Sequence, residues 1–298
     1  MKTLSKKRTK TGDRIFYFCN SLFMILFVVV TLYPVLNTLA LSFNDGTDAL
    51  RGGIYLIPRK WTLKNYITVL QLDDLPTAAL ITVERTIIGT LLSLFANAIL
   101  AFIVSRKRFI FKKGLSLFWV VTMYVNGGLI PTFLLYKSLG LTNSFGVYVI
   151  PGMLSAFNML VIRTFMNGIP DSLEESAQLD GAGYTTIFAR IISPLCKPVY
   201  ATVALFVAVY QWNSWFDAML YNRMSDNLTT LQYELMKLLN SVTRQGSSLE
   251  GMKNSAGSVT PTTVRAAATI ITMLPIICLY PFLQRYFVTG MTLGGVKE

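Results

Sequence analysis

Six stretches of the chain contain no Asp, Glu, Lys or Arg and are rich in apolar residues. They are 19 to 30 residues long, and a helix needs about 20 residues to cross the hydrocarbon core of a bilayer. Backbone groups in lipid must be satisfied within the segment, so the stretches are predicted to be helices and not strands. The pattern therefore predicts an all-α integral membrane protein with six transmembrane helices. The expected spans are about 15–43, 78–105, 114–136, 140–163, 197–217 and 264–286.

The charged residues between these stretches predict the orientation of the chain. Only 14% of the residues are charged, whereas a soluble domain carries about a quarter. With both termini in the cytoplasm, the inner segments, which include a basic head at 1–14, hold 16 Lys and Arg, and the outer segments hold 11. This bias follows the positive-inside rule and also favours contact with anionic membrane lipid. The net charge of +12 is thus interpreted as a signal of topology, and nucleic acid is not an expected partner.

Residues that the sequence lacks disfavour several classes of function. It has no histidine, and its three cysteines are far apart, which disfavours a metal site. No P-loop is present, so ATP is not expected to bind to this chain in that manner. The six stretches hold no carboxylate of the kind that ion-coupled carriers place within the membrane. No pair of catalytic groups indicates an enzyme, so we expect a pore that another protein powers.

The segment 168–194 lies between two apolar stretches, yet its four carboxylates and one arginine exclude it from lipid. We call this segment the elbow and expect it to form two short helices outside the membrane. Asp171 or Ser172 is expected to cap the first helix. Ser172 and Glu175 also have the spacing of a capping box, in which the two side chains bond the free backbone N–H groups at a helix start.

Glycines and a proline are expected to set the ends of the two elbow helices. Gly181 and Gly183 are predicted to end the first helix in left-handed backbone. Pro194 is predicted to stop the second, because proline has no N–H to continue the helical bonding. One face of the second helix is expected to carry Tyr184, Ile187, Phe188 and Ile191.

The elbow resembles the EAA loop of ABC importer permeases. The match consists of Glu175-Ser176-Ala177, then Gly181, then Ile191 and Pro194, and Asp180-Gly181-Ala182 strengthens it. Ser176 replaces the usual first Ala, and Ser193 stands where Leu is commoner. The resemblance implies a coupling helix seated in a cleft of a cytoplasmic ATPase subunit. The residues implied in coupling are Glu174, Glu175, Ser176, Ala177, Asp180, Gly181, Ala182 and Pro194.

The whole chain, from about residue 13 to residue 298, resembles permeases of the carbohydrate-uptake class, specifically the complex-polysaccharide or lipoprotein type. This implies the type I ABC importer permease fold in a bacterial cytoplasmic membrane. The implied partners are a second related permease chain, two ATPase subunits that hold ATP and magnesium, an extracytoplasmic solute-binding protein and a carbohydrate. The outer segment 217–263 and the tail 291–298 are either partner contacts or plain solvated segments.

The third predicted span contains a break in its helix pattern. Two glycines precede Pro131, and this proline leaves the carbonyl of Gly127 without its usual donor. Irregular backbone at membrane depth is tolerated where it is buried in protein or lines a wet cavity. The break, with Tyr124, Asn126 and Gly127, is therefore either an element of the substrate pathway or a packing kink. Asn158 in the fourth span is expected to face protein and not lipid.

An aromatic and amide run at the end of the fifth span is the candidate sugar contact. Sugars offer apolar ring faces and many hydroxyls, which aromatic rings and polar side chains can match. If the helix continues, Gln211 and Trp215 share one face, and Tyr210, Asn213 and Asp217 share another. The alternative is an aromatic belt at the outer interface, above all for Trp212 and Trp215. A similar run occurs in the polysaccharide-type permeases that the chain resembles.

These observations predict a permease subunit of an ATP-driven importer that moves a carbohydrate, with an oligosaccharide as the expected size class, by alternating access. An importer for amino acids, peptides or phosphate is the alternative of the same kind. A stand-alone carrier and a membrane scaffold without transport are alternatives of other classes. The adjacent charges Glu84 and Arg85 at the outer end of the second span are expected to meet water or another subunit.

Overall fold

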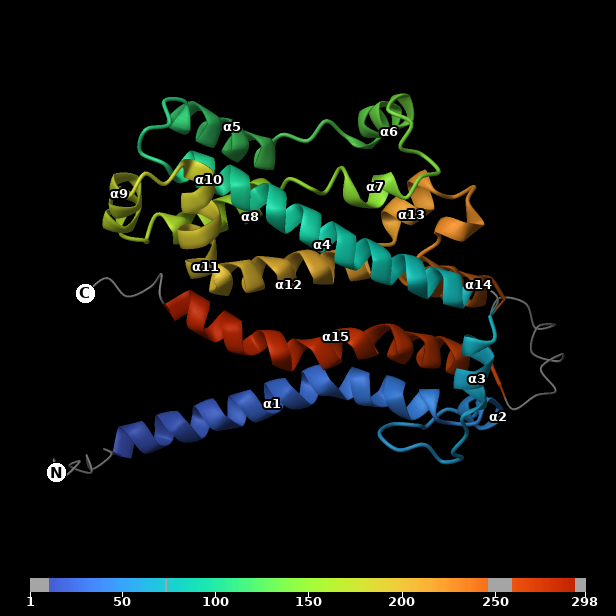
Figure 1. The fold of residues 1–298 in the computed structure, drawn as a ribbon. Helices are drawn as coiled ribbons and strands as arrows, with labels where there is room; N and C mark the ends of the chain where they lie inside the picture. The colour runs from blue at the N-terminus through green and yellow to red at the C-terminus, as the bar shows by residue number, and fades with distance from the viewer. Residues whose placement is uncertain (1–10, 73, 246–258, 293–298) are drawn as a thin grey trace. The chain divides into compact units, whose positions relative to one another are not determined.

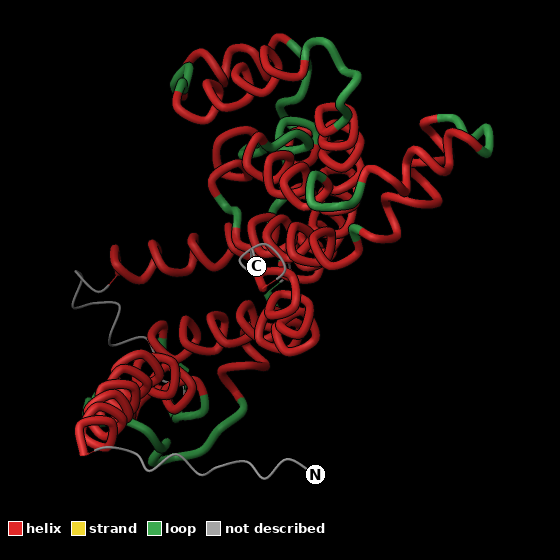
Figure 2. Tube along the Cα trace, turned by 90° about the vertical axis from the view of Figure 1, so that its left-hand side faces the viewer, coloured by secondary structure: helices red, strands yellow, loops and turns green. Residues whose placement is uncertain are grey.

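The computed structural model describes residues 11–72, 74–245 and 259–292. Within them, helices joined by loops form the fold (Figure 2). The sole extended pairing in the described residues is an isolated bridge between Asn44 and Trp61. This confirms the predicted all-α class. Most of the basic head, the middle of the outer segment and residues 293–298 of the tail lie outside the described residues, and so do the predictions made for them.

The chain divides into two compact units, Met1–Gln71 with Ser241–Ile271, and Leu72–Asn240 with Thr272–Glu298. In the first unit, a hydrogen-bonded cluster of buried amides and hydroxyls organises the loop that follows the first helix. The side chain of Asn65 donates to the carbonyls of Ser42 and Asn44 and accepts from Thr263. The helices here are α1 (Thr11–Ser42), α2 (Gly46–Ala49), α3 (Lys64–Leu70) and the first part of α15 (Pro261–Thr292).

The second unit is built around one long helix, α4 (Leu75–Ser105), which packs against α12 and α8 (Figure 1). Small buried residues on α4 allow close packing, and Ala101 and Phe102 enter a core with Met159 and Val203. The other helices are α5 (Lys112–Tyr124), α6 (Leu129–Ser138), α7 (Gly146–Val149), α8 (Ala156–Met166), α9 (Asp171–Leu179), α10 (Tyr184–Thr186), the π-helix η1 (Ile187–Ile192), α11 (Ser193–Leu195), α12 (Lys197–Asn213), α13 (Phe216–Tyr221), the 3-10 helix η2 (Asp226–Leu228) and α14 (Leu231–Gln245).

Three helices in the described part of the chain are long and apolar enough to cross a membrane: Gly12–Ser42, Leu75–Ser105 and Pro261–Pro281. Two bent pairs raise this number to five if each pair is one span. The pairs are Lys112–Tyr124 with Leu129–Ser138, bent by 115°, and Tyr184–Leu195 with Lys197–Asn213, bent by 79°.

The predicted fourth span is divided between α7 and α8. The segment between them contains Pro151, which cannot donate to a helical bond, and Gly152, which favours irregular backbone. Neither helix is long enough to cross a bilayer alone, so the count of six spans stays a prediction.

The elbow contains two helical parts, but three details of its prediction are wrong. Pro170 and not Asp171 or Ser172 is the N-cap of α9, and no side chain caps this helix, so the capping box does not form. Gly181 adopts the expected left-handed backbone with φ of +79°, whereas Gly183 has φ of −75° and begins α10. Pro194 does not end the second part. It lies in the first turn of α11, where proline needs no donor, and the chain reaches it through η1.

Candidate functional site

The elbow presents an uneven surface of acidic, small and apolar side chains. Ala177 is buried against the core that also holds Ile187 and Ile192, so it fixes the inner face of α9. On the outer face, Leu179 is 89% exposed at the end of the helix. Glu175, Ser176, Asp180 and Gly181 are also exposed. Because these residues make no core contact, this face is available to another molecule.

The acidic residues of α9 divide into two groups. Glu174 forms an ion pair with Arg106, and Asp171 forms one with Lys107, so both are held by the loop that follows α4. The hydrogen bond with Lys107 lowers the pKa of Asp171, and Asp171 raises the pKa of Lys107. Glu175 forms no ion pair within the described part of the chain, and it is exposed.

A cavity of about 370 Å³ lies between the α7–α8 connection and α12. Its wall combines aromatic rings with hydroxyl and amide groups and contains no charged side chain. Tyr210 is 66% exposed and Phe206 38%, while Asn158 is 8% exposed, as expected for a side chain that faces protein. The lining residues are Gly152, Leu154, Ser155, Asn158, Phe206, Val207, Tyr210 and Gln211.

The irregular backbone beside this cavity is held by a buried amide on α4. Asn97 is fully buried, and its Nδ2 donates to the carbonyl of Met153 at 3.0 Å. Its Oδ1 accepts from the N–H of Ser155 at 3.1 Å. The two bonds satisfy backbone groups that the break between α7 and α8 leaves without helical partners. Asn97 therefore determines the shape of one cavity wall without lining it.

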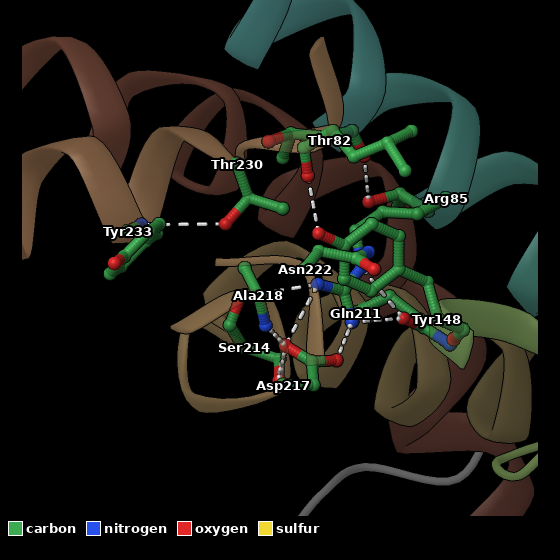
Figure 3. Close-up of polar contacts among 12 residues, drawn as sticks. Thr82, Arg85, Tyr148, Gln211, Ser214, Asp217, Ala218, Asn222, Thr230 and Tyr233 are labelled. Atoms are coloured by element: carbon green, nitrogen blue, oxygen red, sulfur yellow. Dashed lines mark hydrogen bonds and ion pairs between the residues drawn. The ribbon is translucent and has the colours of Figure 1, made fainter. Parts of the chain in front are cut away.

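A second buried cluster joins α4 to the start of α13 (Figure 3). The guanidinium of Arg85 is 1% exposed and donates to both carboxylate oxygens of Asp217, at 3.2 and 2.5 Å. It also donates to Oε1 of Gln211, at 3.1 and 2.8 Å, and lies 4.4 Å from the ring centre of Tyr148. Gln211 donates in turn to the carbonyl of Tyr148 at 3.1 Å. A charge expected to meet water or another subunit is instead satisfied within the chain.

The aromatic run does not form the two helical faces expected of it, because α12 ends at Asn213 and Ser214 is extended. Tyr210 and Gln211 line the cavity, whereas Asp217 is turned to Arg85. Trp212 is buried and donates to the carbonyl of Thr272 at 2.9 Å. The side chain of Asn213 bonds Val209 and Gln232, and the ring of Trp215 packs edge-on against Phe216.

The break in the third predicted span is present as a 115° bend between α5 and α6. Asn126 accepts from the N–H of Gly128, whose φ of +87° favours glycine. Tyr124, with 83% of its surface exposed, Asn126 and Gly127 are not among the residues that line the cavity at α12. Their part in a substrate pathway stays a prediction.

Several residues of this site were not singled out from the sequence. Ser155 and Phe206 look like ordinary members of apolar stretches, and Asn97 is one amide inside such a stretch. The sequence offers two signals. Asn97 is an amide inside a predicted apolar span, and the Pro151-Gly152 pair marks irregular backbone. Neither signal identifies which distant residues meet.

The described chain is an all-helical fold with helices long and apolar enough to cross a membrane, an uncharged cavity and an exposed acidic elbow. A search against models of protein families found no match. The chain is 33% identical over 278 residues to the polygalacturonan/rhamnogalacturonan transport system permease protein YtcP of Bacillus subtilis, covering 92% of this chain and 96% of that protein. It is 34% identical to LplC of the same organism over 97% of both chains.

A solved structure has the same fold. It is a chain of a bacterial ABC transporter involved in the import of the acidic polysaccharide alginate, with 28% identity and a TM-score of 0.85 over 94% of this chain and 99% of that chain. The protein described here belongs to the permease subunits of carbohydrate ABC importers. The whole-chain resemblance to permeases of the carbohydrate-uptake class is thereby confirmed.

Proposed function

We propose that this chain is one of two related permease subunits that move an oligosaccharide into the cytoplasm by alternating access. The cavity between the α7–α8 connection and α12 is the observation that carries this proposal. Tyr210 and Phe206 offer ring surfaces for the apolar faces of sugars, and Asn158 and Ser155 offer groups for their hydroxyls. The cavity thus fits the chemistry of a saccharide.

The uncharged lining also distinguishes this substrate from the alternatives. An amino acid, a peptide or phosphate would bring a charge into a wall without a countercharge, because the nearby Arg85 is already paired with Asp217. Such a charge is costly to bury without a partner. The chain is therefore proposed to contact a neutral saccharide, or a neutral part of a charged one. Gln211 would contribute through its position at the wall, whereas Trp212 and Asp217 would support the site from behind.

The assembly proposed for transport contains a second permease, two ATPase subunits and an extracytoplasmic binding protein. ATP and magnesium would be held by the ATPase subunits, and this chain would hold neither. We propose six spans in a bacterial cytoplasmic membrane, with both termini inside. The structure of an alginate importer bound to a pentasaccharide-loaded periplasmic protein has a similar fold, with a TM-score of 0.59 at 16% identity. The exposed face of α9, with Glu175 and Leu179, is the proposed ATPase contact.

The test is to purify the chain with its co-assembling subunits in lipid nanodiscs and measure ATP hydrolysis with added solutes. The solutes are neutral oligosaccharides, uronic-acid oligosaccharides of equal length, amino acids, peptides and phosphate. We expect oligosaccharides, neutral or uronic-acid, to stimulate more strongly than amino acids, peptides or phosphate. Stimulation by amino acids or phosphate alone would contradict the proposal.

Variants of the cavity test the oligosaccharide contact, and variants of the elbow test the coupling to the ATPase. Tyr210→Ala and Asn158→Ala should raise the oligosaccharide concentration needed for stimulation, whereas Tyr280→Ala should not. Tyr280 is a similarly exposed tyrosine on α15 that is not part of the cavity wall. The double variant Glu175→Lys with Gly181→Trp should still be inserted in the membrane. It should not co-purify with the ATPase subunits or stimulate their ATP hydrolysis. Normal uptake by that double variant would refute the coupling role of the elbow.

A further inference from the structure

Arg106 connects α9 of the elbow to α4. It directly follows the last residue of α4 and forms an ion pair with Glu174 through Nη1. The side chains of Arg106 and Glu174 are 12% and 16% exposed. The second carboxylate oxygen of Glu174 accepts from Gln178 at 3.1 Å, which orients the carboxylate. The pair is therefore partly withdrawn from solvent, where the loss of one partner matters more than at an open surface.

The guanidinium of Arg106 is fixed from two further sides. Its Nε and Nη2 donate to Oγ of Ser105 at 3.1 and 2.9 Å. Its planar group lies 4.7 Å from the ring centre of Phe102, one turn back on α4. Because an arginine can bond and stack at the same time, this side chain is held in a single geometry. Lysine at this position would keep the charge but would lack the planar guanidinium, whose several N–H groups bond Ser105 and Glu174 together.

The ring of Phe102 extends the connection into the second half of the elbow. It lies 5.1 Å, centre to centre, from the ring of Phe188 in the π-helix η1. Phe102 also belongs to the core that contains Ala177 of α9 and Ile187 of η1. Arg106 and Phe102 thus bind both parts of the elbow to the end of one helix. π-turns within helices occur frequently at functional positions.

The other contacts of α4 reach the cavity. Asn97, nine positions before Arg106 on the same continuous helix, bonds the backbone of Met153 and Ser155 beside the cavity wall. Gly89 approaches Gln211 closely enough that a Cβ at Gly89 would lie 2.6 Å from Nε2 of that side chain. A shift of the cytoplasmic end of α4 would therefore displace two parts of the cavity wall.

We propose that Arg106 is a positioning residue that makes α4 move with the elbow, so that α4 transmits the elbow's motion to the cavity. This proposal rests on the proposed coupling of the elbow to an ATPase. It gives Glu174 a role within this chain and leaves Glu175 to face the ATPase. The neighbouring pair of Lys107 and Asp171 joins the same two elements, but its side chains are 75% and 51% exposed. It is therefore a matched control that should not transmit motion.

The experiment measures whether ATP changes access to the cavity. A cysteine is placed in the wall by Leu154→Cys, in a background where the exposed Cys19 and Cys278 are replaced by Ala. The whole complex is assembled in nanodiscs, and the rate of reaction with a water-soluble maleimide is measured with and without ATP and magnesium. ATP hydrolysis, subunit recovery and the melting temperature are measured on the same samples.

With Arg106 intact, we expect ATP to change the maleimide rate about fivefold or more, and in Arg106→Ala or Glu174→Gln by less than about twofold. Both variants should still co-purify with the ATPase subunits, and the complexes should still hydrolyse ATP. A merely destabilised chain would not assemble in this way. The exchanged pair, Arg106→Glu with Glu174→Arg, should restore part of the ATP-dependent change. Lys107→Ala should retain all of it.

Three results would overturn the proposal. The first is an unchanged ATP effect on the maleimide rate in Arg106→Ala, and the second is an equal loss in Lys107→Ala. Failure of the proposed function would be seen separately, because no ATPase subunit would then co-purify even with the chain in which Arg106 is intact. A complex that loses the ATPase subunits only in Arg106→Ala would also overturn the proposal, since Arg106 would then be an assembly residue.

Discussion

The carboxylate of Asp217 lies 2.5 Å from the guanidinium of Arg85, although 132 positions separate the two residues in the chain. The arginine side chain is 1% exposed and the aspartate side chain 20%. Gln211 supplies a further acceptor and Tyr148 an aromatic face, so nearly the whole guanidinium is satisfied. The pair joins α4 to the first turn of α13, directly behind the cavity. It fixes the irregular connection at Ser214.

Removing either partner of this pair should strongly destabilise the protein. Arg85→Met leaves a carboxylate without its cation, and Asp217→Asn leaves a buried cation unneutralised, each costing about 3–5 kcal/mol. The double variant should lose less than the sum of the two, because neither charge is then isolated. Thermal unfolding of the four purified proteins in nanodiscs measures this cycle. Strict additivity would show that the two charges are independent.

Gly89 should tolerate no side chain. A Cβ there would lie 2.6 Å from Nε2 and 2.9 Å from Cδ of Gln211, whose amide is held by Arg85 and Tyr148. Gly89→Ala should therefore displace Gln211 and lower the free energy of unfolding by about 1–3 kcal/mol. Gly114→Ala is the control, because no atom lies within 4 Å of a Cβ at that position of α5. There alanine should stabilise by up to about 1 kcal/mol through its better helix propensity. Equal effects at the two glycines would contradict this account.

The sequence predicted several features that depend on neighbours along the chain, although the cap of α9 and the roles of Gly183 and Pro194 in ending helices were predicted wrongly. Charge-free stretches indicated membrane helices, and Gly181 in a polar segment indicated a left-handed turn, because lipid and backbone sterics act locally. The partner of Arg85 could not be predicted, since the pairing depends on how α4 and α13 pack. Similarly, the end of α12 at Asn213 follows from an extended Ser214 whose carbonyl accepts from Arg85. The cavity combines residues from two distant segments, and a periodic pattern in one of them does not reveal the other.

The exposed pair of Lys107 and Asp171 should be insensitive to pH across the neutral range. Asp171 has a pKa below its ordinary 3.8, so its stabilising effect is complete above that value and is lost as pH falls through the lowered pKa. Lys107 has a pKa above its ordinary 10.5, so its effect is complete below that value and is lost as pH rises through the raised pKa.

The difference in melting temperature between the unchanged protein and Lys107→Ala should therefore stay constant between about pH 5 and pH 9. It should shrink when salt is raised, because exposed charges are screened. The same scan of Asp171→Asn is the control and should give the same flat profile. A difference that grows or falls steadily within this pH range would show that another titrating group acts on the pair.

Asn97 should be required for the shape of the cavity. Replacing it with Leu leaves the carbonyl of Met153 and the N–H of Ser155 without their partners, at about 1–3 kcal/mol for each unsatisfied group. Asn97→Asp keeps the acceptor for Ser155 but loses the donor to Met153 and buries a carboxyl group, so it should also destabilise. Ser93→Ala is the control, because it removes only a contact of Asn97 on its own helix and leaves both bonds to the break. The measurements are the melting temperature and the rate at which maleimide reacts with Leu154→Cys. An unchanged rate in Asn97→Leu would show that the wall at Leu154 holds its shape without this amide.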